Sequence, residues 1–246
     1  MKVIVTGAGG RMGKELLALI EAGMRGSVLA AAVDPNAPAF DTVPVYEHIG
    51  DFGGKADVII DFSHHSAAAE VCEYAVKTGT PVLIATTGQT DEENEIINKA
   101  SEKVAVFRSA NMSLGVALLC ELAKTAAKNM PDADIEIVEK HHNRKLDAPS
   151  GTALLIADCI QKVRESAEYV FGRSGHAKRT QNEIGIHALR LGNIVGEHEV
   201  IISTDNETIT LKHEARSRAL FAEGANAAAD FLKDKAPGMY SMNDIF

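Results

Sequence analysis

The sequence predicts an α/β protein in which a domain with a parallel sheet is joined to an α+β domain with a mixed or antiparallel sheet. Short β-branched runs alternate with helical patterns over roughly the first hundred residues, which is typical of a parallel sheet covered by helices. A glycine-rich turn follows the first of these runs directly. After Asn111 the pattern changes to long helices and a group of strands, which indicates a second domain.

The first part of the chain contains five runs with apolar residues on both faces, as expected for buried parallel strands. They are Val3 to Val5, Ser27 to Val33, Val58 to Ile60, Val82 to Ile84 and Val104 to Val106. Helical patterns lie at Arg11 to Ala22, Ser66 to Thr78 and Asp91 to Ser101. Ser66 and Thr90 are expected to cap the second and third of these helices, because hydroxyl oxygens accept from free N–H groups there.

The second part predicts a helix over Ser113 to Asn129 that stops before Pro131, because proline interrupts a helix. A strand, a polar loop starting at Lys140 and a helix starting near Ser150 follow, and 165–182 shows little periodicity. Three strands come next, the last two flanking a turn at Asp205-Asn206. They are Ile184 to Leu191, Glu197 to Thr204 and Glu207 to His213, and the first strand of this part is Asp134 to Glu139. With a last helix at Ala219 to Lys233, we expect a dinucleotide-binding domain over 1–112 and 219–246, and a substrate-binding and oligomerisation domain over 113–218.

Charge and composition exclude several classes of partner. The 246 residues carry 25 basic and 34 acidic side chains, a net charge of −9 that disfavours nucleic acid and anionic membranes. No apolar run approaches the ~18 residues needed to cross a bilayer. The three cysteines show no metal-binding spacing, and we expect reduced thiols in a cytoplasmic protein without a metal site.

The glycine turn is the first candidate site. The turn contains Gly7, Ala8, Gly9, Gly10, Arg11 and Met12, and its glycines lie where a nucleotide pyrophosphate approaches a helix N-terminus. Asp34 ends the second predicted strand, where a carboxylate can accept hydrogen bonds from ribose hydroxyls. We therefore predict a Rossmann-like domain that binds NADH or NADPH. Because Asp34 repels a 2′-phosphate, NADH is expected to be used at least as well as NADPH.

Two more loops follow predicted strands, at the edge where ligands of open α/β sheets collect. The first contains Ala85, Thr86 and Thr87, and the second contains Ser109, Ala110, Asn111 and Met112. Taken alone, both loops fit ordinary turn chemistry as well as cofactor binding.

The densest cluster of cationic side chains in this acidic chain lies at residues 140–145. His141, His142, Arg144 and two lysines precede a helix start at Ser150-Gly151-Thr152. Backbone N–H groups, a hydroxyl and adjacent cations together suit a carboxylate or phosphate. Histidine and lysine can also exchange protons, so this segment predicts a small anionic substrate and acid–base chemistry.

The run from Glu139 to Ala153 closely resembles the signature E-x-H-H-x-x-K-x-D-x-P-S-G-T-A of the 4-hydroxy-tetrahydrodipicolinate (dihydrodipicolinate) reductase family. The likeness extends over nearly the whole chain, from Gly7–Gly13 through Val58–Ser63 and Ile184–His187 to Gly238–Asp244. Two departures concern the nicotinamide side. Ala85 replaces the first glycine of the usual Gly-Thr-Thr-Gly, and Met112 stands where an aromatic residue is common.

The resemblance implies an NAD(P)H-dependent reduction of 4-hydroxy-tetrahydrodipicolinate, via dihydrodipicolinate, to tetrahydrodipicolinate in the diaminopimelate route to lysine. It also implies that His141 and Lys145 are catalytic, and that His142, Gly151 and Thr152 contact a carboxylate of the dicarboxylate substrate. Gly7 to Met12, Asp34, Ala85 to Thr87 and Ser109 to Met112 match the family's cofactor segments. A homotetramer formed through the sheets of the substrate domain is expected on the same ground.

Three alternatives remain at this stage. An aspartate-semialdehyde dehydrogenase needs a nucleophilic cysteine, whereas Cys120 and Cys159 lie in apolar helical patterns that suit packed thiols. A homoserine dehydrogenase is disfavoured only by the basic segment. A sensor that binds NAD(H) without turnover has no need for the histidine-lysine cluster.

Overall fold

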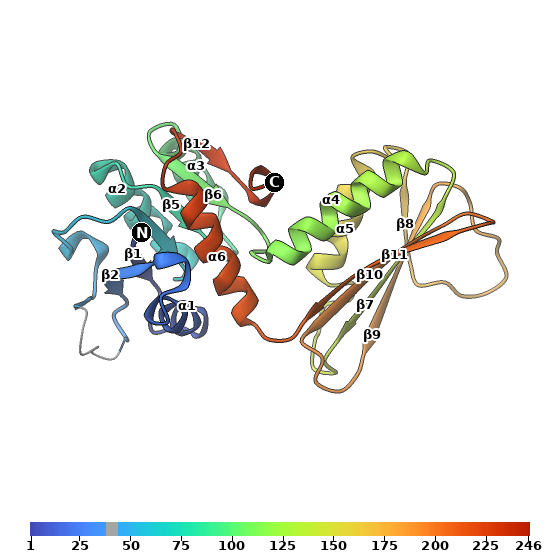
Figure 1. The fold of residues 1–246 in the computed structure, drawn as a ribbon, viewed down its shortest axis with the longest axis horizontal. Helices are drawn as coiled ribbons and strands as arrows, with labels where there is room; N and C mark the ends of the chain where they lie inside the picture. The colour runs from blue at the N-terminus through green and yellow to red at the C-terminus, as the bar shows by residue number, and fades with distance from the viewer. Residues whose placement is uncertain (38–43) are drawn as a thin grey trace. The chain divides into compact units, whose positions relative to one another are not determined.

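The computed structural model describes residues 1–37 and 44–246, which form two compact units (Figure 1). The first unit contains Met1–Leu114 and Ala219–Phe246, and the second contains Gly115–Arg218. The chain leaves the first unit and returns to it with its last helix. One unit has a parallel sheet and the other a mixed sheet, so the predicted fold class is confirmed.

The sheet of the first unit has seven strands, all parallel, in the order β12-β6-β5-β4-β1-β2-β3. Strand order reverses between β1 and β4, and ligands of open α/β sheets bind at such a reversal, beyond the carboxyl ends of the strands. The strands are β1 (Lys2–Thr6), β2 (Val28–Val33), β3 (Val45–Tyr46), β4 (Val58–Asp61), β5 (Val82–Ile84), β6 (Ala105–Arg108) and β12 (Gly238–Tyr240).

Four α-helices among the described residues accompany this sheet. α1 packs against α6 and α2 packs against α3, each on an apolar face, so the central strands are buried on both sides. β4, for example, is buried at every position, and burying each Val or Ile side chain stabilises the fold by about 1.5–3 kcal/mol. The helices are α1 (Arg11–Glu21), α2 (Ala68–Thr78), α3 (Asp91–Ser101) and α6 (Ala219–Leu232).

The sheet of the second unit has five strands in the order β11-β10-β7-β9-β8. β7, β9 and β8 are parallel, whereas β10 is antiparallel to both of its neighbours, so the sheet is mixed, as predicted. The strands are β7 (Asp134–His141), β8 (Glu168–Phe171), β9 (Glu183–Arg190), β10 (Gly196–Ser203) and β11 (Thr208–Ala215).

Two helices, α4 (Leu114–Asn129) and α5 (Gly151–Gln161), supply the apolar core of the second unit. Strand residues alternate between buried and half-exposed, since successive side chains of a strand point to opposite faces. Ile135 and Ile137 of β7 and Val200 of β10 pack against the helices. The same alternation puts Glu139 and His141 on the helix-covered face.

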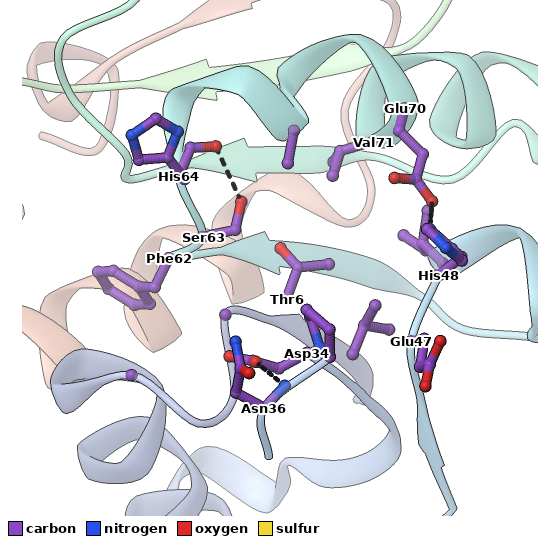
Figure 2. Close-up of a pocket in the computed structure, with 16 residues that line it drawn as sticks. Thr6, Asp34, Asn36, Glu47, His48, Phe62, Ser63, His64, Glu70 and Val71 are labelled. Atoms are coloured by element: carbon purple, nitrogen blue, oxygen red, sulfur yellow. Dashed lines mark hydrogen bonds and ion pairs between the residues drawn. The ribbon is translucent and has the colours of Figure 1, made fainter.

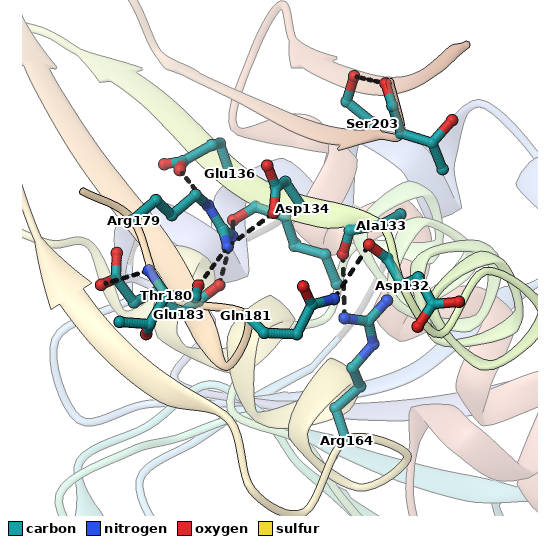
Figure 3. A network of polar contacts seen from close by, with 12 residues as sticks. Asp132, Ala133, Asp134, Glu136, Arg164, Arg179, Thr180, Gln181, Glu183 and Ser203 are labelled. Atoms are coloured by element: carbon teal, nitrogen blue, oxygen red, sulfur yellow. Dashed lines mark hydrogen bonds and ion pairs between the residues drawn. The ribbon is translucent and has the colours of Figure 1, made fainter. Parts of the chain in front are cut away.

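A network of polar contacts fastens the segment between β8 and β9 (Figure 3). Arg179 pairs with Asp134 and Glu136 of β7 and donates to backbone carbonyls of β7 and β9. Arg164 donates to the carbonyls of Met130 and Ala133 beyond the end of α4. These arginines join the segments around the start of β7 through their carbonyl oxygens and carboxylates, so they brace one end of the sheet.

The structure corrects three predictions about elements and adds two short strands. The predicted polar loop at Lys140 is wrong, because β7 continues through His141 by pairing with β9 and β10. Residues 165–182 contain a strand, β8, which is too short to give a clear alternation of apolar and polar residues. Ser66 does not cap α2: it lies in a 3₁₀ turn (His65–Ala67), and α2 begins at Ala68. The short strands β3 and β12 were not predicted.

No helix within the described ranges combines the length and apolar character that crossing a bilayer requires.

Candidate functional site

The glycine turn joins β1 to the N-terminus of α1. Gly7 has φ +72°, and a Cβ on it would lie 2.4 Å from the carbonyl oxygen of Phe62. A Cβ on Gly13 would lie 2.1 Å from the carbonyl oxygen of Gly7. Gly10 caps α1 without a side-chain hydrogen bond, and the first turn of α1 has no acidic residue. The N–H groups of Gly7, Ala8, Gly9 and Gly10 donate to acceptors within the protein, so the first turn of α1, with its positive dipole end, is the part that suits an anion.

Asp34, one residue beyond β2, braces this turn. Its carboxylate accepts from the N–H of Gly9 at 3.0 Å and from the N–H of Asn36 at 2.7 Å. Each oxygen keeps a further lone pair, so Asp34 can still accept from a ligand hydroxyl. The predicted turn residues and Asp34 are thus brought together. Ala8 is fully buried, and its N–H donates to the carbonyl of Val33.

A pocket of about 470 Å³ opens beside this turn (Figure 2). Asp34, Glu47 and Glu70 give it three carboxylates, and Glu70 pairs with His48 at 3.3 Å. No lysine or arginine lines the pocket in the described part of the chain. The lining is Thr6, Gly7, Gly10, Val33, Asp34, Pro35, Asn36, Glu47, His48, Ile49, Phe62, Ser63, His64, Ala67, Glu70 and Val71.

A second pocket, of about 350 Å³, lies beyond the ends of β5 and β6. Thr86 and Thr87 line it from one loop, and Ser109 and Ala110 line it from the next, so the two predicted loops are neighbours. The hydroxyl of Ser109 donates to the carbonyl of Asn111. The N–H of Ala85 donates to the carbonyl of Asp61 in β4. Met112 is buried in the first unit.

Glu139 is the centre of the polar cluster in the second unit. Its side chain is fully buried and accepts from His141 Nδ1 at 2.5 Å, from the guanidinium of Arg190 at 2.8 and 2.9 Å, and from the N–H of Ser150 at 3.0 Å. Burial alone would raise the pKa of Glu139, but these hydrogen bonds outweigh it and lower the pKa to about 2. Glu139 is therefore a carboxylate at neutral pH.

His141 is held in one orientation. The bond from Nδ1 to Glu139 places a proton on Nδ1, and Nε2 then points toward Gly196, where an added Cβ would lie 3.1 Å away. The ring of His198 lies 5.3 Å from that of His141, edge to face. Burial first, and the nearby His141 second, lower the pKa of His198 to about 4, so His198 is neutral. It contacts Ser150 Oγ at 3.2 Å.

Lys145 and His142 lie on the loop that follows β7. Lys145 Nζ is 2.8 Å from Asp147, and this bond lowers the pKa of the Asp147 carboxyl. His142 Nδ1 is buried without a hydrogen-bond partner among the described residues. Burial and the charges of Arg144, His141, Arg218 and Lys145, in that order, lower the pKa of His142. An uncharged His142 at the centre of several cations suits contact with a carboxylate.

Ser150, Gly151 and Thr152 form the N-terminus of α5, as predicted. Ser150 is the N-cap, and its Oγ accepts from the N–H of Ala153 at 3.2 Å. No acidic residue lies in the first turn, and a Cβ on Gly151 would meet nothing within 4 Å. The start of the helix therefore adds a positive dipole end and an open backbone to the cations of the preceding loop, and both suit an anion. Within residues 1–37 and 44–246, no group of three or more metal-ligating side chains gathers.

The structure adds residues to which the sequence analysis gave no role: Glu139, Arg190, His198 and Asp61. Glu139 is two residues before His141 on the same strand face, so a strand predicted through His141 would have paired them. Arg190 and His198 were out of reach of such reasoning, because they join the cluster only through strand pairing.

Two family models match the chain. One, described as "Dihydrodipicolinate reductase, N-terminus", matches residues 1–112, and the other, "Dihydrodipicolinate reductase, C-terminus", matches residues 115–246. The chain belongs to the dihydrodipicolinate reductase family. The resemblance carried by the histidine-lysine segment is thereby confirmed.

Similar proteins agree with this family. The 4-hydroxy-tetrahydrodipicolinate reductase of Caldanaerobacter subterraneus subsp. tengcongensis is 49% identical, over 100% of this chain and 98% of the relative. The 4-hydroxy-tetrahydrodipicolinate reductase of Clostridium tetani is 42% identical, over 99% of this chain and 96% of the relative. A solved structure, dipicolinate-bound dihydrodipicolinate reductase from Paenisporosarcina sp. TG-14, is 26% identical with a TM-score of 0.85, over 100% of this chain and 99% of that one.

As a member of the dihydrodipicolinate reductase family, the chain is an oxidoreductase with 4-hydroxy-tetrahydrodipicolinate reductase activity, which serves diaminopimelate and lysine biosynthesis. It belongs to a family of reductases. The alternative dehydrogenases and the non-enzymatic sensor are therefore set aside. Cys120 and Cys159 are 2% and 5% exposed, which also disfavours a nucleophilic role.

Proposed function

We propose that the first unit binds the nicotinamide cofactor and that the second binds and protonates the dicarboxylate substrate. The dinucleotide-binding domain then comprises 1–112 and 219–246, and the substrate domain 113–218. The observation that carries this proposal is the buried Glu139–His141 pair beside Lys145 and the N-terminus of α5. These residues combine proton carriers with a site for carboxylates.

The glycine turn fits a dinucleotide, because Gly7 and Gly13 allow the tight turn and the close backbone packing of β1, the turn and α1, where a Cβ would clash. We assign the pyrophosphate to the turn over Gly7 to Met12, with the N–H groups of Arg11 and Met12 at the start of α1 as its donors, and the adenosine ribose to Asp34. The loops at Ala85 to Thr87 and Ser109 to Met112 line the nicotinamide side. When bound, the reduced nicotinamide supplies the two electrons of the reduction.

On the substrate side, His142, Gly151 and Thr152 hold one carboxylate. The backbone at the start of α5 donates to it, and the cations around His142 favour it electrostatically. A relative of similar fold binds dipicolinate, a planar dicarboxylate, which supports a substrate of this chemistry.

Lys145 donates the proton that completes the reduction, since its ammonium group carries three donors beside the carboxylate site. His141 carries protons at Nε2, and Glu139 keeps the ring in place by accepting from Nδ1. Asp147 holds the ammonium group in position until a substrate carboxylate approaches it.

Cofactor preference follows from the first pocket. A 2′-phosphate would meet the carboxylate of Asp34, with Glu47 and Glu70 on the same lining. No lysine or arginine of the described lining would compensate, so NADH serves at least as well as NADPH. We also propose a cytoplasmic homotetramer formed through the half-exposed face of the five-stranded sheet.

The test is an assay of cofactor oxidation, fed by the product of aspartate semialdehyde and pyruvate condensation. We expect a kcat/KM with NADH at least equal to that with NADPH. Lys145→Ala should lower kcat by about 100-fold, because a positioned acid contributes on the order of 10²–10⁴. Lys128→Ala, at an exposed lysine near the end of α4, is the matched control and should retain full activity. Near-normal turnover by Lys145→Ala, or a strong preference for NADPH, would contradict the proposal.

A further inference from the structure

Asp61, the last residue of β4, is a buried carboxylate that the proposed mechanism does not use. It is 1% exposed, yet no lysine, arginine or histidine of the described residues lies within ion-pair distance of it. Burying a carboxylate is costly unless hydrogen bonds replace its water. The hydrogen-bond partners of Asp61 must therefore explain why a carboxylate can be buried at this position.

Those partners come from the ends of three neighbouring strands. Oδ1 accepts from the hydroxyl of Thr6 at 2.5 Å, from the hydroxyl of Ser63 and from the N–H of Ser63 at 3.1 Å. Oδ2 accepts from the hydroxyl of Thr86 at 2.9 Å. Thr6 ends β1, Ser63 follows β4 and Thr86 follows β5, so one carboxylate joins the three segments.

This junction lies at the point where the strand order reverses. β1 and β4 are paired there, with Thr6 opposite Asp61, and their following loops diverge to the two sides of the sheet. Gly7 comes directly after Thr6, and its Cα is so close to the Phe62 backbone that a Cβ would clash at 2.4 Å. Thr6 and Ser63 also line the first pocket (Figure 2), and Thr86 lines the second.

We propose that Asp61 is a positioning residue for the cofactor: its carboxylate sets the glycine turn, the Ser63 loop and the Thr86-Thr87 loop in the mutual arrangement that the nicotinamide dinucleotide requires. This inference rests on the proposed cofactor site. Asp61 acts through its hydrogen-bond partners and does not itself touch the cofactor. Each hydroxyl group that donates to Asp61 has its O–H direction fixed, which also fixes the position of its lone pairs.

The experiment compares Asp61→Asn with Asp57→Asn in the full chain. Asparagine keeps the shape of Asp61 but replaces an acceptor by a donor, so at least one hydroxyl must turn away. Asp57 is a matched control: it precedes the same strand at its other end, is exposed, and accepts from the N–H of Lys2 at 2.6 Å. The Kd for NADH is measured by fluorescence titration, and kcat is measured at saturating NADH.

We expect Asp61→Asn to raise the Kd for NADH about tenfold while kcat at saturation stays within threefold, and Asp57→Asn to bind like the wild type. A merely structural role would reduce the active fraction and leave the Kd unchanged. If Asp61→Asn binds NADH within twofold of the wild type, or if Asp57→Asn is equally weakened, the inference is wrong. Failure of the wild type to bind NADH or NADPH would instead overturn the proposed function.

Should Asp61→Asn not fold, Thr6→Val and Ser63→Ala decide the question, since each removes one donor to Asp61. Each is expected to weaken NADH binding about fivefold. An effect below twofold in both would overturn the inference. If Asp61→Asn does fold, its combination with Thr86→Val should be less than additive, because the amide nitrogen takes the place of Oδ2 and both changes break the contact with Thr86.

Discussion

At the residue scale, Glu139 shows how a buried charge can set the chemistry of its neighbour. Its carboxylate is balanced by Arg190 and hydrogen-bonded to His141 and to the backbone of Ser150. Removing one partner of a buried pair leaves the other uncompensated. The orientation of His141 therefore depends on Glu139 keeping its charge.

We predict that Glu139→Gln lowers kcat by about tenfold to hundredfold with a smaller change in KM, because a misoriented His141 affects proton transfer more than binding. Glu199→Gln, at a half-exposed glutamate of the neighbouring strand β10, is the control and should have little effect. The same pair of variants tests pH dependence. The folded pKa of Glu139 is about 2, below its ordinary value, so its contribution to stability is present above about pH 4.5 and is lost as the pH falls toward 2.

Denaturant unfolding from about pH 5 down to about pH 2 measures this contribution. The wild type and Glu199→Gln should lose more stability over that range than Glu139→Gln, which has no carboxyl group to protonate there. Equal losses in all three proteins would show that Glu139 is not held ionised by its partners.

At the scale of elements, two helix N-termini have the same kind of N-cap but play different roles. Thr90 caps α3 in a capping box with Glu93, and Ser150 caps α5. Ser150 also donates its N–H to Glu139 and contacts His198, so its cap belongs to the polar cluster. Among the described residues, Thr90 has hydrogen bonds only to the first turn of its own helix.

Ser150→Ala and Thr90→Ala should each lower the free energy of unfolding by about 1 kcal/mol, the usual cost of losing a cap. Only Ser150→Ala is expected to lower kcat/KM for the substrate, by about tenfold, since only that cap lies beside the proposed carboxylate site. Denaturant unfolding and steady-state kinetics measure the two effects. An equal loss of activity in Thr90→Ala would mean that the kinetic effect reflects stability alone.

At the scale of the whole molecule, the first unit is closed by residues from both ends of the chain. α6 packs against α1, and Asn226 of α6 is fully buried. Its side chain accepts from Ser27 Oγ at 2.8 Å and donates to the carbonyl of Met24 at 3.2 Å. The unit is therefore complete only when the chain has returned from the second unit.

Asn226→Ala should reduce the free energy of unfolding by about 2 kcal/mol, because it leaves the buried Ser27 hydroxyl and Met24 carbonyl without these partners. The control is Asn129→Ala: this exposed asparagine donates to the carbonyl of Thr125 within its own helix, and its loss should cost less than about 0.5 kcal/mol. Thermal and denaturant unfolding compare the two. Similar costs would show that the long-range contact contributes nothing beyond local structure.

Much of this structure was accessible from local pattern. The buried strands, the helices, the Thr90 and Ser150 caps and the glycine turn all depend on neighbours within a few residues. The errors arose where local pattern is weak. β3, β8 and β12 have two to four residues each, and β7 extends into a charged segment because its backbone pairs with strands on both sides.

The sequence by itself determined the alternation of strands and helices, the glycine turn and the histidine-lysine segment, because each is written in contiguous residues. Only the tertiary structure decided which buried carboxylates form hydrogen bonds beside the glycine turn and the histidine-lysine segment. Arg190 reaches Glu139 across 51 positions, and Thr6 reaches Asp61 across 55. Such contacts depend on strand order and register, which arise from packing the whole sheet, and no local spacing in the sequence encodes them.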